Sequence, residues 1–267
     1  MKENIKNPLL DTYQTPFNTP PFDQIKNHHY IPAFNQGIKL LDEEIQAIVN
    51  QTEEPTFENT IVALEQSGKL LDRVSSAFFN ILSAEANDEM MDISQQISPK
   101  LSESSNNIFL NEELFTRIKK VYDQKEKLQL SIEDSRLLEE TFESFSKRGA
   151  ALNPEDKERY RQLSTELSLL TLSFEQNALK DKNRYELLLT NKTDLAGLPE
   201  SICESALLRA KEKGKTGWLF NLSAPSYIPF MRYTASRELR KTMYQAYMSI
   251  GNKGDEYDNK EIIRKIV

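Results

Sequence analysis

Apolar residues recur every three or four positions along the first two thirds of the chain, a spacing that gathers side chains on one side of an α-helix. The segment 55–101 organises the rest, and a helix is predicted over 55–85. Thr56 can cap this helix, whose first turn also carries the favourable negative charge of Glu58. Gly68 interrupts the stripe, which indicates either a close approach by another helix or a tolerated surface glycine. The apolar positions of the stripe are Ile61, Leu64, Leu71, Val74, Phe78 and Ile81.

The same periodicity predicts further helices on both sides of this segment. One begins near Ile31, and four more follow Asn87, Asn111, Ser131 and Asn153, which have side chains suited to a helix N-cap. The connections between these helices are short. The sequence therefore predicts a mainly α fold, built as an antiparallel helical array.

Two of these helices permit finer predictions. Pro99 lies within the helix that follows Asn87, and it should kink or restart that helix. The longest helix begins at Pro154, and its apolar stripe is predicted to face the core. The stripe residues are Tyr160, Leu163, Leu167, Leu170, Phe174 and Ala178.

The pattern changes in residues 183–267, which we predict to be a small α+β segment. Residues 184–190 and 218–222 are apolar runs flanked by turn-forming residues, and they predict a two-strand element near 184–222. Their relative direction stays open, because a long connection can serve a parallel or an antiparallel pair. An amphipathic helix is predicted between the strands, and another over about 235–248.

The N-terminal residues 7–27 combine four prolines with several apolar residues. Prolines prevent a regular helix, whereas the apolar side chains are too many for a solvated tail. We therefore predict an extended Pro-rich strap (1–30) docked across the helical array (31–182). A Pro-rich recognition peptide is the functional alternative. The expected anchors are Leu9, Leu10, Tyr13, Phe17 and Phe22.

The final run, 261–267, begins an apolar helical pattern that is too short to be stable by itself. We expect it to lead into a C-terminal lobe that these residues do not include. A docked terminal turn is the alternative interpretation.

Composition excludes several classes of function. The 267 residues include 28% charged and 38% hydrophobic residues, and the net charge is −7 without a basic cluster, so no nucleic-acid partner is expected. Cys203 is the only cysteine, so an internal disulfide is impossible. We expect Cys203 to be a small buried apolar residue. No apolar stretch is long enough to cross a membrane or to act as a secretory signal. We expect a cytoplasmic protein, with the periplasm as the alternative.

The search for catalytic chemistry finds no constellation. His28 and His29 are the only histidines, and adjacent side chains point in different directions, so they cannot hold zinc as a His-Glu-x-x-His helix does. We interpret both as structural or surface residues. The carboxylate pairs 43–44 and 139–140 are expected to form solvated faces or to pair with lysines. No Gly-x-Ser-x-Gly elbow, phosphate loop or dinucleotide fingerprint occurs, so we assign no catalytic, cofactor-binding or metal-binding residue.

Several sequence words nevertheless resemble one family in the order in which they occur. These words are TPF (15–17), HYIPAFNQGI (29–38), PTFENTIVALEQSG (55–68), LLDRVSSAFFNILSAEAND (70–88), ISPKLS (97–102), LNEELFTRIKKVYDQ (110–124), RLLEETFESFSKRGAAL (136–152) and LAGLPE (195–200). They resemble the N-terminal region of the peptidyl-dipeptidase Dcp and oligopeptidase A group. This group consists of zinc metallopeptidases related to thimet oligopeptidase and neurolysin.

The resemblance implies that the helical N-terminal part and the catalytic C-terminal part have different roles. The chain would be the non-catalytic N-terminal part of a peptidyl-dipeptidase that releases C-terminal dipeptides from short peptides. Its helices would form one wall of a substrate channel, like the N-terminal lobe of neurolysin, and the zinc ligands would lie downstream of residue 267. Short peptides and the missing C-terminal lobe are then the expected partners, and the chain alone should be inactive. Two alternatives remain: a fragment of an oligopeptidase A-like endopeptidase, and a self-contained helical protein-interaction module.

Overall fold

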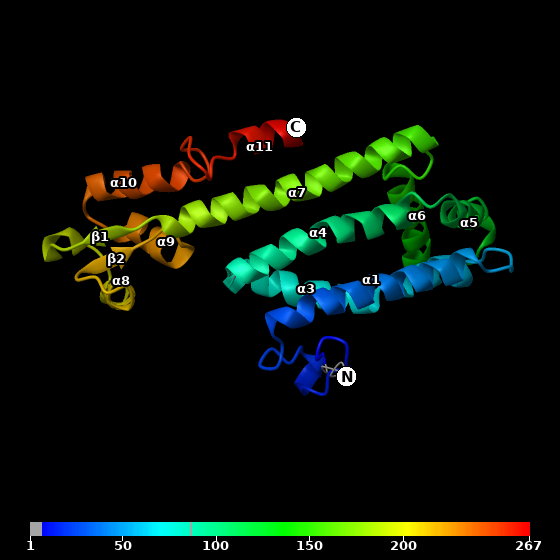
Figure 1. Ribbon diagram of the computed structural model, residues 1–267, viewed down its shortest axis with the longest axis horizontal. Coiled ribbons are helices and arrows are strands. Elements are labelled where there is room, and N and C mark those ends of the chain that lie inside the picture. Colours follow the sequence, from blue (N-terminus) through cyan, green and yellow to red (C-terminus); the bar gives the residue numbers. More distant parts are fainter. Residues whose placement is uncertain (1–6, 86) are drawn as a thin grey trace, which may run out of the picture. The chain divides into compact units, whose positions relative to one another are not determined.

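The computed structural model describes residues 7–85 and 87–267. The chain is mainly α-helical, and the described residues contain one small antiparallel sheet, which confirms the predicted fold class (Figure 1). The chain forms two compact units, of which unit 1 ends at Leu169 and unit 2 extends from Leu170 to Val267. The predicted division at residues 30 and 182 stays a prediction, and residues 1–6 of the predicted strap lie outside the described residues.

Unit 1 is an array of helices around α1. Helix α1 packs against α3 and α4, and α5 packs against α6. Successive helices α1, α3 and α4 run in alternating directions, as the antiparallel array requires (Figure 1). The elements of unit 1 are η1 (Pro16–Asn18), α1 (Asn27–Val49), η2 (Phe57–Val62), α2 (Ala63–Gln66), α3 (Lys69–Glu85), α4 (Asp88–Phe109), α5 (Glu112–Tyr122), η3 (Lys125–Lys127), α6 (Ile132–Lys147) and the first half of α7 (Pro154–Arg184).

Side chains cap the helices where the sequence predicts them. The Thr56 hydroxyl accepts a hydrogen bond from the Asn59 amide at 3.1 Å and opens η2. The side-chain oxygens of Asn87, Asn111 and Ser131 accept from the backbone amide three residues ahead in the same way. Each bond satisfies one backbone donor that a helix start leaves unpaired, so these residues fix where the helices begin.

The helix predicted over 55–85 is divided into separate elements. Its first turns are the π-helix η2, α2 ends at Gln66, and α3 begins at Lys69. Gly68 adopts a φ of +81° between them, a left-handed conformation that glycine accepts without steric cost, and its amide donates to Glu44 Oε2 at 2.7 Å. A turn therefore explains Gly68, and neither of the two predicted explanations applies.

The close approach between helices occurs instead at Gly37 of α1. A Cβ atom built on Gly37 would lie 3.1 Å from the Leu71 Cα atom of α3. The Phe34 ring, one helical turn earlier, meets the Phe78 ring edge to face at 5.5 Å between centroids. Both rings are fully buried, so α1 and α3 hold the first apolar core of unit 1 together.

Helix α4 is continuous through Pro99, so the predicted restart does not occur. Proline removes one backbone hydrogen bond, but Ile97 beside it is fully buried in the first core. Tertiary packing therefore holds the helix across the missing bond.

The strap docks through fewer residues than predicted. Leu9 and Tyr13 are buried, whereas Leu10, Phe17 and Phe22 are exposed. The Leu9 carbonyl accepts a hydrogen bond from Arg73 Nη2 at 3.1 Å, and the Arg73 guanidinium lies 4.7 Å from the centre of the Tyr13 ring. Buried Ile25 and a 2.8 Å hydrogen bond from Asn7 Nδ2 to the His29 carbonyl also attach the strap, and the other three predicted anchors are wrong.

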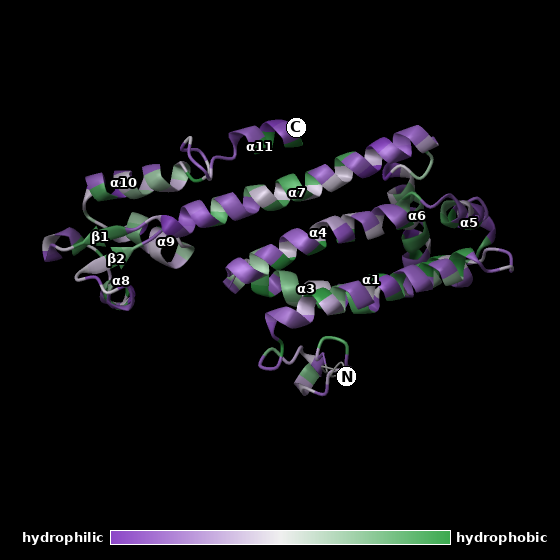
Figure 2. Ribbon diagram, in the orientation of Figure 1, coloured by the Kyte–Doolittle hydropathy of each residue, from purple (hydrophilic) through white to green (hydrophobic). Residues whose placement is uncertain are grey.

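The apolar stripe predicted for α7 is also wrong in its first half. Leu163 and Leu167 are 47% and 46% exposed, whereas the buried residue of this half is Lys157. Figure 2 shows α7 as a predominantly hydrophilic helix with a hydrophobic stretch near its middle. The first half packs through polar side chains, because its contacts on the neighbouring helices are carboxylate and amide groups.

Unit 2 is built on a two-stranded antiparallel sheet. Strands β1 (Leu187–Leu189) and β2 (Trp218–Phe220) confirm the predicted strand pair, with Leu188 opposite Leu219, and they settle its direction. Its apolar core includes Phe220, Phe230 and Met243. The further elements are η4 (Lys192–Leu195), α8 (Glu200–Glu212), α9 (Ala224–Tyr233), α10 (Arg237–Met248) and α11 (Lys260–Ile266). The sequence did not predict α9, since prolines 225 and 229 masked its pattern.

A buried carboxylate joins the end of α7 to the loop after α10. Asp181 is fully buried and accepts from Lys253 Nζ at 2.7 Å, from the Gly251 amide at 2.8 Å and from Arg184 Nε at 2.8 Å. Burial opposes ionisation, but the bonds from Lys253, Gly251 and Arg184 outweigh it and lower the pKa of Asp181. The ionised carboxylate therefore stabilises unit 2.

We predict that Asp181→Asn lowers the free energy of unfolding of unit 2 by about 3 kcal/mol at neutral pH, since it leaves buried cationic donors without their anion. The folded-state pKa lies below the ordinary value of 3.8, so this stabilisation is complete above that pH. The difference between wild type and variant should shrink as the pH falls through the folded-state pKa. The free energy of unfolding of each protein is measured by urea unfolding, followed by the fluorescence of Trp218, the only tryptophan.

The matched control is Asp255→Asn, which removes a partly exposed carboxylate that pairs with Arg184. This substitution should lower the free energy of unfolding by less than about 1 kcal/mol. Equal losses in the two variants would contradict the role given to the buried carboxylate.

Candidate functional site

A polar seam joins α4 to the first half of α7 within unit 1. The Asn106 side chain is buried and donates to Ser164 Oγ at 2.8 Å. Arg161 Nη1 donates to Asn107 Oδ1 at 2.8 Å, one position further along α4. Lys157 Nζ, also buried, donates to Glu112 Oε1 of α5 at 2.8 Å. The bonds of Asn106 and Arg161 therefore join α7 to α4, and the bond of Lys157 joins it to α5.

Two residues of the seam, Asn106 and Arg161, line an open groove of about 630 Å³, which we call the α4–α7 groove. Charged side chains line it, with Glu103 on α4 and Glu158, Arg161 and Glu166 on α7. Amide and hydroxyl groups of Asn106, Gln162 and Thr165 also line it, and Pro99 and Leu169 add apolar surface. Such a surface offers hydrogen-bond acceptors and donors to a polar, extended ligand.

A second hollow, the α1–α4 depression, lies on the other side of Glu103 and has a volume of about 310 Å³. Asp42 of α1 and Glu103 of α4 both line it, and burial together with the charge of Glu103 raises the pKa of Asp42. Lys100 and Asn35 also line it, and Lys100 Nζ donates to Asn35 Oδ1 at 2.9 Å. The remaining lining residues are Ile38, Ser104 and Asn107.

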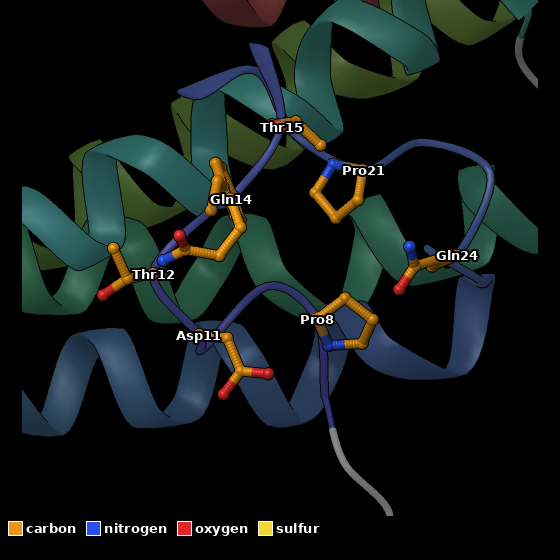
Figure 3. Close-up of a pocket in the computed structure, with 8 residues that line it drawn as sticks. Pro8, Asp11, Thr12, Gln14, Thr15, Pro21 and Gln24 are labelled. Atoms are coloured by element: carbon orange, nitrogen blue, oxygen red, sulfur yellow. The ribbon is translucent and has the colours of Figure 1, made fainter. Parts of the chain in front are cut away.

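The strap encloses a hollow of about 510 Å³ that Figure 3 shows. Its lining comes from the strap itself. One side is formed by Pro8, Pro21 and Gln24, and the other by Asp11, Thr12, Gln14 and Thr15. Burial raises the pKa of Tyr13, which also lines the hollow, although Arg73 opposes the shift. The phenol is therefore neutral, and we assign the strap hollow a structural role.

Unit 2 has a mainly apolar hollow of about 410 Å³ beside α8. Cys203 and Trp218 line it, with Glu200 and Glu204 at its charged side. Cys203 is half-buried, so the prediction of a buried residue is wrong, because α8 turns this face toward the hollow. Burial, assisted by the charge of Glu200, raises the pKa of the Cys203 thiol, which keeps it protonated and a poor nucleophile.

The two histidines occupy the start of α1. His29 is buried, and its Nδ1 accepts from the Lys26 amide at 3.0 Å, so the imidazole caps the helix. Burial lowers the pKa of His29, and His28 and Lys26 lower it further, which keeps the ring neutral. In the part of the chain that the structure describes, no group of three or more His, Cys, Asp or Glu side chains could hold a metal ion.

The carboxylate pairs also have ordinary partners. Glu43 pairs with Lys39 at 3.5 Å, and Glu44 caps α3 through the Gly68 amide. Glu139 pairs with Lys125 at 3.1 Å, and Glu140 pairs with Arg136 at 2.7 Å.

No helix within 7–85 or 87–267 has the length and apolar character that crossing a membrane requires.

Comparison with known proteins finds similarity to the N-terminal region of proteins named as peptidases. No protein-family model matches it. Over 98% of its length it is 37% identical to a dipeptidyl carboxypeptidase of Salmonella typhimurium and 38% identical to one of Escherichia coli. It is 31% identical to oligopeptidase A of Haemophilus influenzae over 99% of its length. The chain is a homologue of this group. It spans 38–39% of the length of these relatives.

The homology confirms the resemblance seen in the sequence, and the structure shows what the shared words encode in this homologue. The word at 29–38 supplies Phe34 and Gly37 to the contact between α1 and α3. The word at 195–200 contains Gly197, whose φ is +88° and where a Cβ atom would lie 2.2 Å from the Tyr233 carbonyl oxygen. These words therefore specify packing and turns.

We predict that Asn106→Ala lowers the free energy of unfolding of unit 1 by about 2 kcal/mol, because it removes a buried bond and leaves Ser164 without its partner across the seam. Urea unfolding followed by circular dichroism measures the loss. A double-mutant cycle with Ser164→Ala should give a coupling of about 1 kcal/mol. Asn107→Ala, at an exposed position of the same seam, is the control and should cost less than about 0.5 kcal/mol. A coupling energy near zero would contradict the claim that the bond between Asn106 and Ser164 stabilises unit 1.

Proposed function

We propose that this chain forms the helical, non-catalytic N-terminal part of a zinc-dependent peptidyl-dipeptidase that releases C-terminal dipeptides from short peptides. The observation that carries the proposal is the similarity over 98% of the chain to two dipeptidyl carboxypeptidases, at 37% and 38% identity. Identity to the oligopeptidase A of Haemophilus influenzae is lower, at 31%. This difference favours removal of dipeptides over internal cleavage.

The described residues do not fit a catalytic zinc site. His29 uses its Nδ1 as a helix cap, and no cluster of three ligating side chains exists in the described ranges. A zinc ion in such an enzyme polarises the scissile carbonyl and activates water. We place its ligands in polypeptide downstream of residue 267, and no step of the reaction is assigned to this chain.

The task of this chain, in our proposal, is to admit and orient the substrate as one wall of a channel. The α4–α7 groove supports this role, because it is open, carries charged and amide side chains along its lining, and lies beside the hydrogen bonds of the seam. Backbone amides of an extended peptide can donate to Glu103 and Glu166, and its carbonyls can accept from Arg161. A channel between helical walls admits short unfolded peptides and excludes folded proteins.

The first half of α7 also supports a partner lobe. Leu163 and Leu167 are about half exposed on this helix, away from the polar seam. We propose that the C-terminal lobe of the longer protein covers them, since exposed apolar surface is characteristic of interfaces. We also propose the cytoplasm as the compartment, with which a single cysteine is compatible; the periplasm is the alternative.

A second candidate is an endopeptidase like oligopeptidase A. The observation that favours it is the 31% identity to the Haemophilus influenzae enzyme over 99% of this chain. Both candidates assign the same scaffold role to these helices. They differ in whether the substrate must present a free C-terminus.

We predict that the purified 267-residue chain neither binds zinc tightly nor hydrolyses an N-blocked tripeptide, whereas the product of a longer reading frame that contains it does both. Metal analysis after dialysis and mass spectrometry of the products measure these outcomes. Release of a C-terminal dipeptide supports the proposal, and loss of cleavage on amidation of the C-terminus identifies the dipeptidase.

Internal cleavage that tolerates the amide would favour the endopeptidase instead. Zinc-dependent hydrolysis by the 267-residue chain alone would refute the scaffold role. A longer protein that is inactive with zinc would refute the peptidase proposal altogether and return the chain to the class of helical interaction modules.

A further inference from the structure

The imidazole of His29 joins the strap to the start of α1. Its Nδ1 accepts a hydrogen bond from the Lys26 backbone amide at 3.0 Å, and the Lys26 carbonyl accepts from the His29 amide at 2.9 Å. His29 thus takes the place that glutamate or glutamine holds in a capping box, three residues after the N-cap. Because Lys26 is the last strap residue before α1, this cap fixes the strap where it meets the helix.

The other end of the strap also reaches His29. Asn7 Nδ2 donates to the His29 carbonyl at 2.8 Å, and Asn7 Oδ1 accepts from the Leu9 amide at 3.1 Å. Leu9 and Ile25, near the two ends of the strap, are both buried in the first apolar core with Tyr30. A change at His29 therefore affects both ends of the strap and its cover of this core.

The cap requires a neutral imidazole. Nδ1 accepts only while it carries no proton, so the ring proton lies on Nε2. Protonation makes both ring nitrogens donors, and Nδ1–H would then face the N–H of Lys26. The bond cannot persist in that state. Since His29 is only 7% exposed, the imidazolium would also need to move toward water.

The start of α1 opposes a positive charge on this ring. Burial lowers the pKa of His29, and the charges of His28 and Lys26 lower it further. The N-terminal end of a helix dipole is positive as well. The charged groups next to His29 along the chain therefore favour the neutral, capping form of the ring.

The neighbouring elements do not compensate this charge. Glu89 of α4 accepts from the side chain of the first residue of α1 at 2.6 Å, and Arg73 of α3 brings a further positive charge to the strap. The strap carries Asp11 and Asp23. Among the described residues, no carboxylate is one of the groups that shift the pKa of His29. An imidazolium at this position thus gains no salt bridge that would hold it in place.

We propose that the strap (7–26) is a pH-sensitive switch, in which protonation of His29 breaks the cap of α1 and detaches the strap from the first apolar core. The ordinary pKa of histidine is 6.5, and that of folded His29 is lower. Docking is therefore fully stabilised above pH 6.5, and this stabilisation is lost as the pH falls through the folded-state pKa. The switch depends only on this junction and not on the proposed peptidase activity.

The test is an NMR titration of the isotopically labelled 267-residue chain from about pH 8 to about pH 4.5. The His29 ring should titrate with a midpoint below 6.5, and the Lys26 amide signal should shift with the same midpoint because it loses its acceptor. Hydrogen-exchange protection of the Leu9 and Ile25 amides should fall about fivefold across the transition, as the loss of one helix cap implies. Circular dichroism should stay nearly constant, since the helices remain folded.

Three variants separate the cap from other titrating groups. His29→Gln keeps an acceptor that does not titrate, so its strap should stay docked at about pH 5. His29→Phe keeps a ring without an acceptor, and its exchange protection at neutral pH should match that of the acidified wild type. His28→Gln is the matched control. It should keep the pH response and raise its midpoint, because it removes a charge that opposes protonation of His29.

Four results would overturn the proposal. The first is a strap response in His29→Gln equal to that of the wild type, which would assign the response to another group. The second is a His29 ring that titrates while the Lys26 amide signal and the Ile25 exchange stay unchanged. The third is a ring that stays neutral down to about pH 4.5. The fourth is loss of helical circular dichroism in parallel with the strap, which indicates general acid unfolding. The wild-type titration decides the last three even if a variant does not fold.

Discussion

The contact of α1 with α3 at Gly37 is the constraint on which unit 1 depends. The absence of a side chain there lets the two helices approach until Leu71 lies against the α1 backbone, which brings Phe34 and Phe78 into one core. Further along the same helix, Ile45 and Ile48 enter the second core with α5 and α6. Helix α1 thus connects both cores, and the positions of α3, α4 and α5 follow from it.

The hollows that this arrangement leaves open combine charged and amide groups with apolar surface, a mixture typical of binding surfaces. The imidazole of His29 is neutral and caps α1, and the thiol of Cys203 is protonated and lines the hollow beside α8. Among the described residues, the carboxylates at 42 and 103 form no ion pair; both line the α1–α4 depression, and Glu103 also lines the α4–α7 groove. Binding energy in a helical lobe of this kind would serve to position a substrate for chemistry carried out elsewhere.

Sequence patterns predicted the helices well wherever one face of the helix is apolar and buried and a side chain caps its first turn. They failed where a helix packs against polar side chains of its neighbours and not against apolar ones. Leu163 and Leu167 have the correct spacing for a core, but Asn106 and Ser164 form the interface, and nothing in the spacing marks a buried amide. Residues far apart along the chain supply the two sides of such a seam, so a local pattern does not contain it.

The sequence by itself determined the mainly α class, the capped helix starts, the strand pair and the homology, because these depend on local spacing and on ordered words. Only the tertiary structure decided that Gly37 and not Gly68 is the helix contact, that the strands are antiparallel, and which carboxylates have no ion-pair partner among the described residues. Each of these depends on which distant side chains meet. Asp42 and Glu103 are separated by sixty-one residues in the chain, and only the packing of α1 on α4 brings their charges together.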